Sequence, residues 1–450
     1  MRQGGFLCRQ KMLQSLCLMK YVIIIPDGSA DLAIESLGNR TPLQAANLPN
    51  IQALARSGIV GQSCNVPEGF VPGSDVAVLG LLGYDSALYY TGRAPLEAIA
   101  QGIELTDTDW AIRCNLVTIA DSAMQSFSAG HISTPEAVEI MQTLNEHLAP
   151  KSPIPLQFYP GVSYRNLAIL RDCETPPFDQ STKSYPPHDY SGNPITDALP
   201  TGTGGGLLRT WMSESQKILL NHPVNRQRIE DGKLPATQIW LWGLGQRPNL
   251  PLFWKNIADA HLACTPVLPT PLAQCRGAMI TAVDLLRGIA TLIGWDIINV
   301  PGITGYLDTD FSAKGRYAAE VLKDYDIVCV HIEAPDEAGH EGCAEKKVKS
   351  LEEIDAKVLP PIMEALRSHS EWRLFLSPDH PTPCALRTHT SDGVPWLLAG
   401  SDIPAMAQNY DEETAKKSAY QYERGWEAIG SVLCKHNTNK QKPECYTFLH

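Results

Sequence analysis

The chain has 450 residues, which is too long for one ordinary hydrophobic core, so we expect two or three folding units. Apolar residues make up 44% of it and charged residues 19%, a balance that is typical of globular proteins and excludes a disordered chain. The net charge of -12 argues against a nucleic-acid-binding surface, and no apolar run reaches the roughly 18 residues of a membrane span.

The N-terminal segment, residues 1–18, has neither a continuous apolar region nor a cleavage-site pattern, so a signal peptide is not expected. We interpret it as an extension that precedes the fold. The twelve cysteines are scattered and form no C-x-x-C pair, which favours reduced thiols in a cytoplasmic protein over a disulfide scaffold.

Three short apolar runs predict buried parallel strands, and each is followed within a few residues by a Pro-Asp pair. Ligands of open α/β sheets bind beyond the carboxyl ends of the strands, so the three carboxylates are expected to converge on one site. The runs and their aspartates are Tyr21–Ile25 with Asp27, Ile327–Ile332 with Asp336, and Arg373–Leu376 with Asp379.

Helical patterns alternate with these strands along the chain. They cover Asn50–Arg56, Ala278–Ile293, Ser312–Lys323 and about residues 344–369, the last interrupted at Pro360-Pro361. Such alternation predicts a doubly wound α/β core with a mostly parallel sheet.

The middle of the chain has a different pattern, with several strand-like runs, such as Trp110–Ile119 and Asn166–Leu170, and a proline-rich stretch. We therefore predict a core domain of residues 19–87 and 273–450. A smaller α/β (α+β) domain, residues 88–272, would be inserted into it.

Two local patterns of this insert carry further predictions. Ser133-Thr134-Pro135-Glu136 has the capping-box form of a helix start. The Gly-rich run at residues 201–206 lacks the preceding strand and the following Lys-Ser/Thr of a phosphate loop, so we interpret it as a flexible connector.

Histidines accompany the strand-end aspartates. His340 follows Asp336 by four residues, a spacing that lets a carboxylate and an imidazole reach one cation from a single turn. Asp379 and His380 adjoin, and His389 lies nine residues further on. Taken singly, these residues also fit an aspartate-capped helix and a solvated surface turn. Three carboxylates and three histidines together favour a metal site.

Ser74 stands in V-P-G-S-D-V-A-V-L-G, directly before an apolar helical run. A helix N-terminus favours an anionic phosphate, although a plain N-capping serine is the alternative reading. A hydroxyl that a divalent metal activates becomes a nucleophile without a general base, so Ser74 is the candidate nucleophile.

Several of these segments resemble those of a known superfamily. I-I-P-D-G, P-G-S-D-V-A, A-P-D-E-A-G-H-E-G, S-P-D-H and T-H-T resemble the alkaline phosphatase superfamily, which implies an alkaline-phosphatase-like fold. Four segments of the insert are similar to the archaeal-type cofactor-independent phosphoglycerate mutases. They are Y-T-G-R-A-P-L-E-A (90–98), S-A-G-H-I-S-T (128–134), G-V-S-Y-R-N-L (161–167) and P-P-H-D (186–189).

The resemblance implies two divalent metal ions and no 2,3-bisphosphoglycerate. Mn2+ suits mixed carboxylate and imidazole ligation best, with Mg2+, Zn2+ and Co2+ as alternatives. The implied ligands are Asp336, His340 and His389 for one ion, and Asp27, Asp379, His380 and the hydroxyl of Ser74 for the other.

The implied reaction interconverts 3-phosphoglycerate and 2-phosphoglycerate through a phosphoserine, with the insert as a lid that excludes water. By the same resemblance His131 would contact glycerate as a general acid/base. Arg93, Arg113 and Arg165 are candidates to grip its carboxylate and phosphate. The Asp-Gly-Arg-Asp stretch of the bacterial mutases is absent from the chain, so no substrate residue is carried over from that branch.

Three alternatives remain open. A homoserine-kinase-like phosphotransferase is disfavoured because no P-loop or dinucleotide fingerprint is present. A metal-dependent phosphatase or phosphodiesterase needs the same core without the lid residues. A catalytically silent metal-binding or scaffold protein predicts the loss of one or more ligands, yet all seven positions are filled. The expected partner is a small phosphorylated acid rather than nucleic acid or membrane, and the sequence does not determine the oligomeric state.

Overall fold

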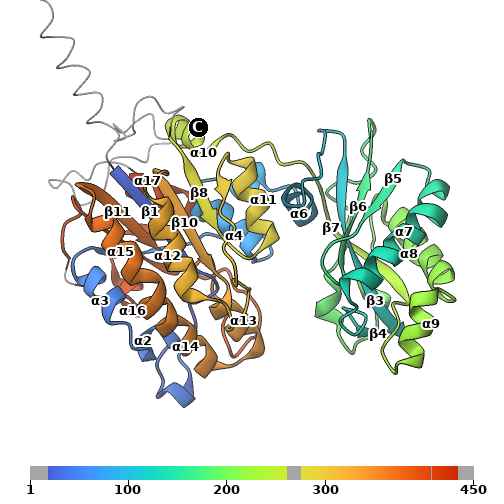
Figure 1. Ribbon diagram of the computed structural model, residues 1–450, viewed down its shortest axis with the longest axis horizontal. Coiled ribbons are helices and arrows are strands. Elements are labelled where there is room, and N and C mark those ends of the chain that lie inside the picture. The colour runs from blue at the N-terminus through green and yellow to red at the C-terminus, as the bar shows by residue number, and fades with distance from the viewer. Residues whose placement is uncertain (1–18, 261–274, 407, 434–450) are drawn as a thin grey trace, which may run out of the picture. The chain divides into compact units, whose positions relative to one another are not determined.

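The computed structural model describes residues 19–260, 275–406 and 408–433, so the predicted extension, residues 1–18, lies outside the described part. The chain divides into two compact units, Met1–Tyr90 with Leu250–His450, and Thr91–Asn249 (Figure 1). The second unit interrupts the first in sequence. Its range is narrower than the residues 88–272 expected for an insert, because the chain from Leu250 onward packs with the first unit.

The first unit is built on an eight-stranded sheet in which every strand except β12 runs in the same direction. The predicted mostly parallel α/β sheet is thereby confirmed. In sheet order the strands are β13 (Gln421–Tyr422), β2 (Ile59–Ser63), β12 (Val394–Gly400), β11 (Glu371–Leu376), β1 (Met19–Pro26), β10 (Ile327–Ile332), β8 (Gly277–Ile280) and β9 (Asp296–Ile297).

Helices cover both faces of this sheet, as a doubly wound fold requires (Figure 1). Val22 and Ile24 of β1 pack into an apolar cluster with side chains of α3, α12 and α15, whereas Tyr21 faces Trp254 of α10. The helices are α2 (Pro42–Ala45), α3 (Pro49–Arg56), α4 (Ser74–Leu81), α5 (Ser86–Tyr89), α10 (Phe253–Ala260), α11 (Asp284–Leu292), α12 (Phe311–Val321), α13 (Ala334–Glu341), α14 (Ala344–Glu353), α15 (Leu359–Arg367), α16 (Glu412–Lys417) and α17 (Ala428–Leu433).

Two predicted helices differ from the structure. The prediction of one helix over Ala278–Ile293 is wrong at its start, because Ala278–Ile280 pairs in parallel register with Val328–Val330 as strand β8. A short apolar run does not distinguish a strand from a helix, and here the neighbouring strand decides. The stretch of residues 344–369 is interrupted slightly before Pro360-Pro361: α14 ends at Glu353, a π-helical turn follows over Ile354–Val358, and the prolines lie in the first turn of α15, where a missing N–H is tolerated.

The second unit is a smaller α/β structure with its own apolar core. Its sheet has the order β4-β3-β6-β5, with β7 on the other side of β3, and all of these pairs are antiparallel. The elements are α6 (Arg93–Ala100), β3 (Trp110–Ala120), β4 (Ala123–Ser126), α7 (Thr134–His147), β5 (Leu156–Tyr159), β6 (Arg165–Leu170), α8 (Gly205–Leu219), α9 (Pro223–Glu230) and β7 (Gln238–Gln246).

The two local predictions for this unit have different outcomes. The capping box at Ser133 is confirmed, since Glu136 accepts from the Ser133 N–H at the start of α7. The Gly-rich run is a helix entrance rather than a free connector: α8 begins at Gly205, and Thr203 donates to the Asp179 carboxylate at 2.7 Å. None of the helices in the described part of the chain combines the length and the apolar character needed to span a bilayer.

Candidate active site

The three strand-end aspartates lie together, as expected from their positions in the sequence. β11, β1 and β10 are neighbouring parallel strands, so Asp379, Asp27 and Asp336 leave the same edge of the sheet. All three carboxylates are buried. Gly28, which follows Asp27, leaves no room for a side chain at this edge. Its φ is +59°, and a Cβ atom there would lie 2.5 Å from the Asp336 carboxylate.

Ser74 is held at this cluster by the start of α4. The N-cap residue is Gly73, so Ser74 is the first helical residue and its hydroxyl does not cap the helix. The hydroxyl donates to Asp27 over 3.4 Å and lies 3.2 Å from Nε2 of His380. The plain N-capping alternative is therefore excluded, and the serine oxygen faces the carboxylates and imidazoles.

His340 and His389 point their Nε2 atoms at one another and at Asp336. The two nitrogens are 2.9 Å apart, and they lie 3.3 and 3.4 Å from the Asp336 oxygens. Each ring has its other nitrogen, Nδ1, on a backbone carbonyl, that of Arg387 for His340 and that of Pro72 for His389. A carbonyl can only accept, so Nδ1 of each ring carries a proton, and Nε2 is the ring nitrogen that faces the cluster.

His380 is oriented in the same way by a hydroxyl. Thr382 donates its proton to the Asp336 carboxylate and lies 3.3 Å from Nδ1 of His380, from which it must then accept. The bare Nε2 of His380 lies 3.6 Å from Asp27 and 3.3 Å from Asp379. The Nε2 atoms of three imidazoles and the oxygens of three carboxylates thus converge, and nitrogen and oxygen ligands of this kind suit a cation at their centre.

Two carboxylate oxygens support this conclusion. Asp27 Oδ1 and Asp379 Oδ2 are buried and accept no hydrogen bond within the described residues. Burial, followed by the charges of Asp379 and Asp336, raises the pKa of Asp27 well above its usual range. Burial also disfavours a charged imidazole, but the hydrogen bond and the charge of Asp336, with the Arg387 carbonyl, together outweigh it and raise the pKa of His340 to about 9. These carboxylate oxygens and imidazole nitrogens fit divalent metal ions as ligands. A bound ion would displace the protons that the raised pKa values place on Asp27 and His340.

The sequence did not single out a group of buried residues behind Asp27. His331 on β10 donates from Nε2 to Asp27 Oδ2 at 2.8 Å, and Thr281 lies 3.2 Å from its Nδ1. Burial lowers the pKa of His331 to about 3, so the ring is neutral. The buried Lys314 donates to the His331 carbonyl, and burial lowers its pKa to about 8. A histidine inside the apolar run I-V-C-V-H-I was the available signal.

In the second unit, two of the three candidate arginines, Arg93 and Arg113, lie around one carboxylate, and the third, Arg165, is close enough to Arg113 to affect its pKa. Nε of Arg113 and Nε of Arg93 lie 2.9 and 3.2 Å from the oxygens of Glu97. The Arg113 guanidinium also stacks on Trp242 at 4.1 Å. Burial, together with the charges of Arg93 and Arg165, lowers the pKa of Arg113 to about 10. Three cationic side chains are thus close together around Arg113, and such a group suits an anionic ligand.

His131 lies on a loop that adjoins the loop of Arg165. Ser163 connects the two loops, because its N–H donates to Thr134 at 3.0 Å and its hydroxyl donates to the Ile132 carbonyl at 2.5 Å. The His131 side chain is exposed and makes no hydrogen bond within the described residues. In the second unit the loop of His131 is therefore hydrogen-bonded to the loop that leads into Arg165.

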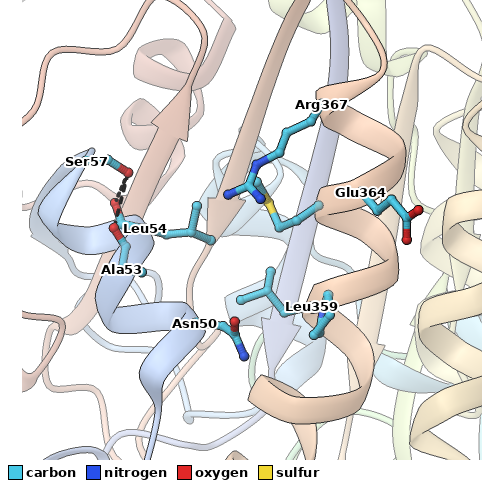
Figure 2. A pocket seen from close by; sticks show the side chains of 9 residues that line it. Asn50, Ala53, Leu54, Ser57, Leu359, Glu364 and Arg367 are labelled. Atoms are coloured by element: carbon cyan, nitrogen blue, oxygen red, sulfur yellow. Dashed lines mark hydrogen bonds between the residues drawn. The ribbon is translucent and has the colours of Figure 1, made fainter.

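A cavity of about 350 Å³ between α3 and α15 is a separate feature (Figure 2). Leu54, Leu359 and Met363 form an apolar part of its lining, and Asn50 and Arg367 add polar groups. None of the residues around Ser74 lines it, so it is not part of the candidate active site.

Known proteins are similar to this chain over almost its whole length. A family model described as 2,3-bisphosphoglycerate-independent phosphoglycerate mutase matches residues 55–225. A 2,3-bisphosphoglycerate-independent phosphoglycerate mutase of Methanothrix thermoacetophila is 44% identical over 89% of this chain and 96% of its own. A probable mutase of the same description from Geobacter sulfurreducens is 42% identical over 92% of this chain and 100% of its own.

Solved structures share the fold. The PH0037 protein from Pyrococcus horikoshii has a TM-score of 0.70 at 28% identity, covering 92% of this chain and 96% of its own. The cofactor-independent phosphoglycerate mutase from Thermoplasma acidophilum has a TM-score of 0.59 at 22% identity, covering 92% and 99%. The predicted resemblance is confirmed, and the chain belongs to the 2,3-bisphosphoglycerate-independent phosphoglycerate mutase family of isomerases.

Proposed function

We propose that this chain interconverts 3-phosphoglycerate and 2-phosphoglycerate at a two-metal site, through a phosphoserine formed on Ser74. The observation that carries the proposal is the group of carboxylate and imidazole ligand atoms that faces the Ser74 oxygen. Family membership supports the substrate, because the relatives are named for this reaction.

The proposed metal ligands divide into two sets. Asp336, His340 and His389 would hold one ion. The two histidine Nε2 atoms are 2.9 Å apart and lie 3.3 and 3.4 Å from the Asp336 oxygens. Asp27, Asp379, His380 and the Ser74 hydroxyl would hold the other, and the first three of these offer atoms within 4.8 Å of one another. His380 is also within this distance of Asp336 and His389, so it stands between the two sets. Mn2+ is the proposed ion because the ligands mix imidazole and carboxylate.

When bound, the two ions would lower the pKa of the serine hydroxyl and neutralise charge on the transferring phosphoryl group. Ser74, having lost its hydroxyl proton to solvent, would form a bond from Oγ to phosphorus as the bond from phosphorus to the glycerate oxygen breaks. That oxygen would take a proton from His131, the proposed carrier. The other hydroxyl of glycerate would then return a proton to His131 and attack phosphorus, which releases Ser74 without its proton. Arg93, Arg113 and Arg165 would retain the glycerate anion between the two steps, and the second unit would act as the lid that excludes water.

The test is to incubate the purified chain with MnCl2 and 3-phosphoglycerate and to measure 2-phosphoglycerate through enolase. Product without added 2,3-bisphosphoglycerate supports the mutase, and intact-mass analysis of quenched enzyme should show one phosphoryl group on Ser74. Ser74→Ala should lower kcat by at least about a thousandfold while Mn2+ still binds. Near-normal turnover by Ser74→Ala would rule out the phosphoserine.

The same preparation separates the alternatives. Release of free phosphate that outpaces isomerisation would indicate a phosphatase instead. Phosphorylation of homoserine that depends on ATP, without isomerase activity, would indicate a kinase-like phosphotransferase.

A further inference from the structure

The loop that carries His131 has a strained backbone. Ala129, Gly130 and His131 all have positive φ, at +48°, +61° and +52°. Alanine and histidine rarely adopt this left-handed conformation, and two such residues beside a glycine persist only where the surroundings impose it. The conformation determines the direction in which the His131 side chain leaves the backbone.

One buried side chain imposes much of this conformation. Arg228 on α9 is 2% exposed and donates from Nη2 to the carbonyl of Ala129 at 2.7 Å and to that of Gly130 at 3.4 Å. Its Nε donates to the Leu234 carbonyl at 2.8 Å, which anchors the guanidinium to the chain after α9. A planar guanidinium has five donors in fixed directions, so it can bind carbonyls on two sides and a carboxylate on a third in a geometry that the point-like ammonium of lysine does not reproduce.

The remaining donor of Arg228 ties the loop to the next helix. Nη1 lies 2.9 and 3.0 Å from the two Glu136 oxygens, and Glu136 also accepts from Ser133 in the capping box of α7. Arg228 therefore connects α9, the strained residues and the first turn of α7. Because all these contacts lie within the second unit, they hold whatever its position relative to the first.

Two serine hydroxyls complete the loop from the other side. Ser126 Oγ accepts from the Gly130 N–H at 2.9 Å, and Ser128 Oγ accepts from the His131 N–H at 3.3 Å. The carbonyls of Ala129 and Gly130 thus accept from Arg228, and the N–H groups of Gly130 and His131 donate to the serines. The His131 imidazole is thereby left exposed on a backbone that is bonded on both sides.

We propose that Arg228 is a positioning residue: it holds Ala129–His131 in left-handed conformation so that the imidazole of His131 is presented to the substrate in one direction. The role of His131 in this inference rests on the proposed function. The clamp, by which we mean the hydrogen bonds from Arg228 that hold residues 129–131, does not depend on that function. Arg228 would contact neither substrate nor metal, and its effect on turnover would pass entirely through His131.

The experiment combines amide hydrogen exchange with a double-mutant cycle. In Arg228→Gln, the peptide that covers residues 126–133 should exchange at least about tenfold faster than in the parent. Isomerisation should show kcat lowered by about tenfold or more with a smaller change in KM, and Arg228→Gln should add nothing in a His131→Ala background. Arg228→Lys, which keeps the charge beside Glu136, should resemble Arg228→Gln because it lacks the fork.

Arg171 offers a matched control in the same unit. It donates to the Glu104 carbonyl and the Asp109 carboxylate, both at 2.7 Å, and has no contact with residues 126–133. Arg171→Gln should leave exchange in that peptide and kcat unchanged. Ser126→Ala removes one bond to the same loop without disturbing the core, and should reproduce a smaller version of the Arg228→Gln effect if the larger change unfolds the unit.

The outcomes separate the two levels of the proposal. Unchanged exchange of residues 126–133 in folded Arg228→Gln overturns the clamp, and an equal loss of kcat with and without His131 overturns its role through that residue. If the parent shows no isomerase activity, the proposed function fails, while faster exchange confined to this peptide still supports the clamp.

Discussion

Replacing Asp27 with asparagine tests whether the carboxylates and imidazoles around Ser74 form a cation site. The change should stabilise the metal-free chain and reduce the stabilisation that metal binding adds. In the metal-free chain Asp27 Oδ1 is buried and has no hydrogen-bond partner within the described residues. Burial, followed by the charge of the neighbouring Asp379, raises the pKa of Asp27. Asparagine keeps one oxygen for His331 and supplies an N–H₂ group to neighbours that only accept. We therefore expect Asp27→Asn to stabilise the metal-free chain above neutral pH.

The magnitudes follow from the two states. A buried acceptor without a partner costs roughly 1–3 kcal/mol, so the metal-free variant should gain about that much. With Mn2+ at about a hundred times the dissociation constant, binding contributes about 2.7 kcal/mol to the stability of the parent. If the lost ligand weakens binding by about a hundredfold, roughly 2 kcal/mol of that contribution disappears.

Urea unfolding of the parent and of Asp27→Asn, each in EDTA and in excess MnCl2, measures both effects. The variant should have the higher midpoint in EDTA, and MnCl2 should raise its midpoint much less than that of the parent, by a difference of roughly 2 kcal/mol. A midpoint that falls by the same amount in both solutions would refute the reasoning, because it would make Asp27 an ordinary structural carboxylate.

Two further predictions concern the frame around the site. Gly28→Ala should weaken Mn2+ binding and destabilise the chain by roughly 2–4 kcal/mol, because the added Cβ would meet the Asp336 carboxylate. Gly38→Ala is the control, since Gly38 has a similar φ of +71° but no atom lies within 4 Å of the added Cβ. It should destabilise the chain by only about 1–2 kcal/mol and leave Mn2+ binding unchanged. Calorimetry with Mn2+ distinguishes them, and equal losses of affinity would contradict the steric explanation. Burial raises the pKa of Glu412 to about 7, so the native chain binds more protons than the unfolded chain above the ordinary glutamate pKa, and its stability falls as pH rises through this window. Glu412→Gln should remove roughly 1–3 kcal/mol of that fall, read from urea midpoints at about pH 5 and pH 8, and an equal midpoint shift at both pH values would argue against it.

Much of the site was predictable because its chemistry lies at strand ends. An apolar run followed by Pro-Asp marks both the strand and the residue that leaves its carboxyl end, so Asp27, Asp336 and Asp379 could be placed on one edge before any contact was known. The helix start at Ser74 was visible for a similar reason, since a short Gly-Ser pair precedes an apolar run. Local patterns of this kind depend on residues close together in the chain.

The sequence by itself determined which residue types stand at the ends of the core strands, and hence the class of chemistry. Only the tertiary structure decided that Ala278–Ile280 is a strand, that His331 supports Asp27, and that Arg228 holds the loop of His131. In each case the partner is distant in sequence: His331 lies 304 residues from Asp27, and Arg228 lies 99 residues from Ala129. A local pattern records what a residue is, whereas strand register and hydrogen-bond direction depend on which distant segment packs against it.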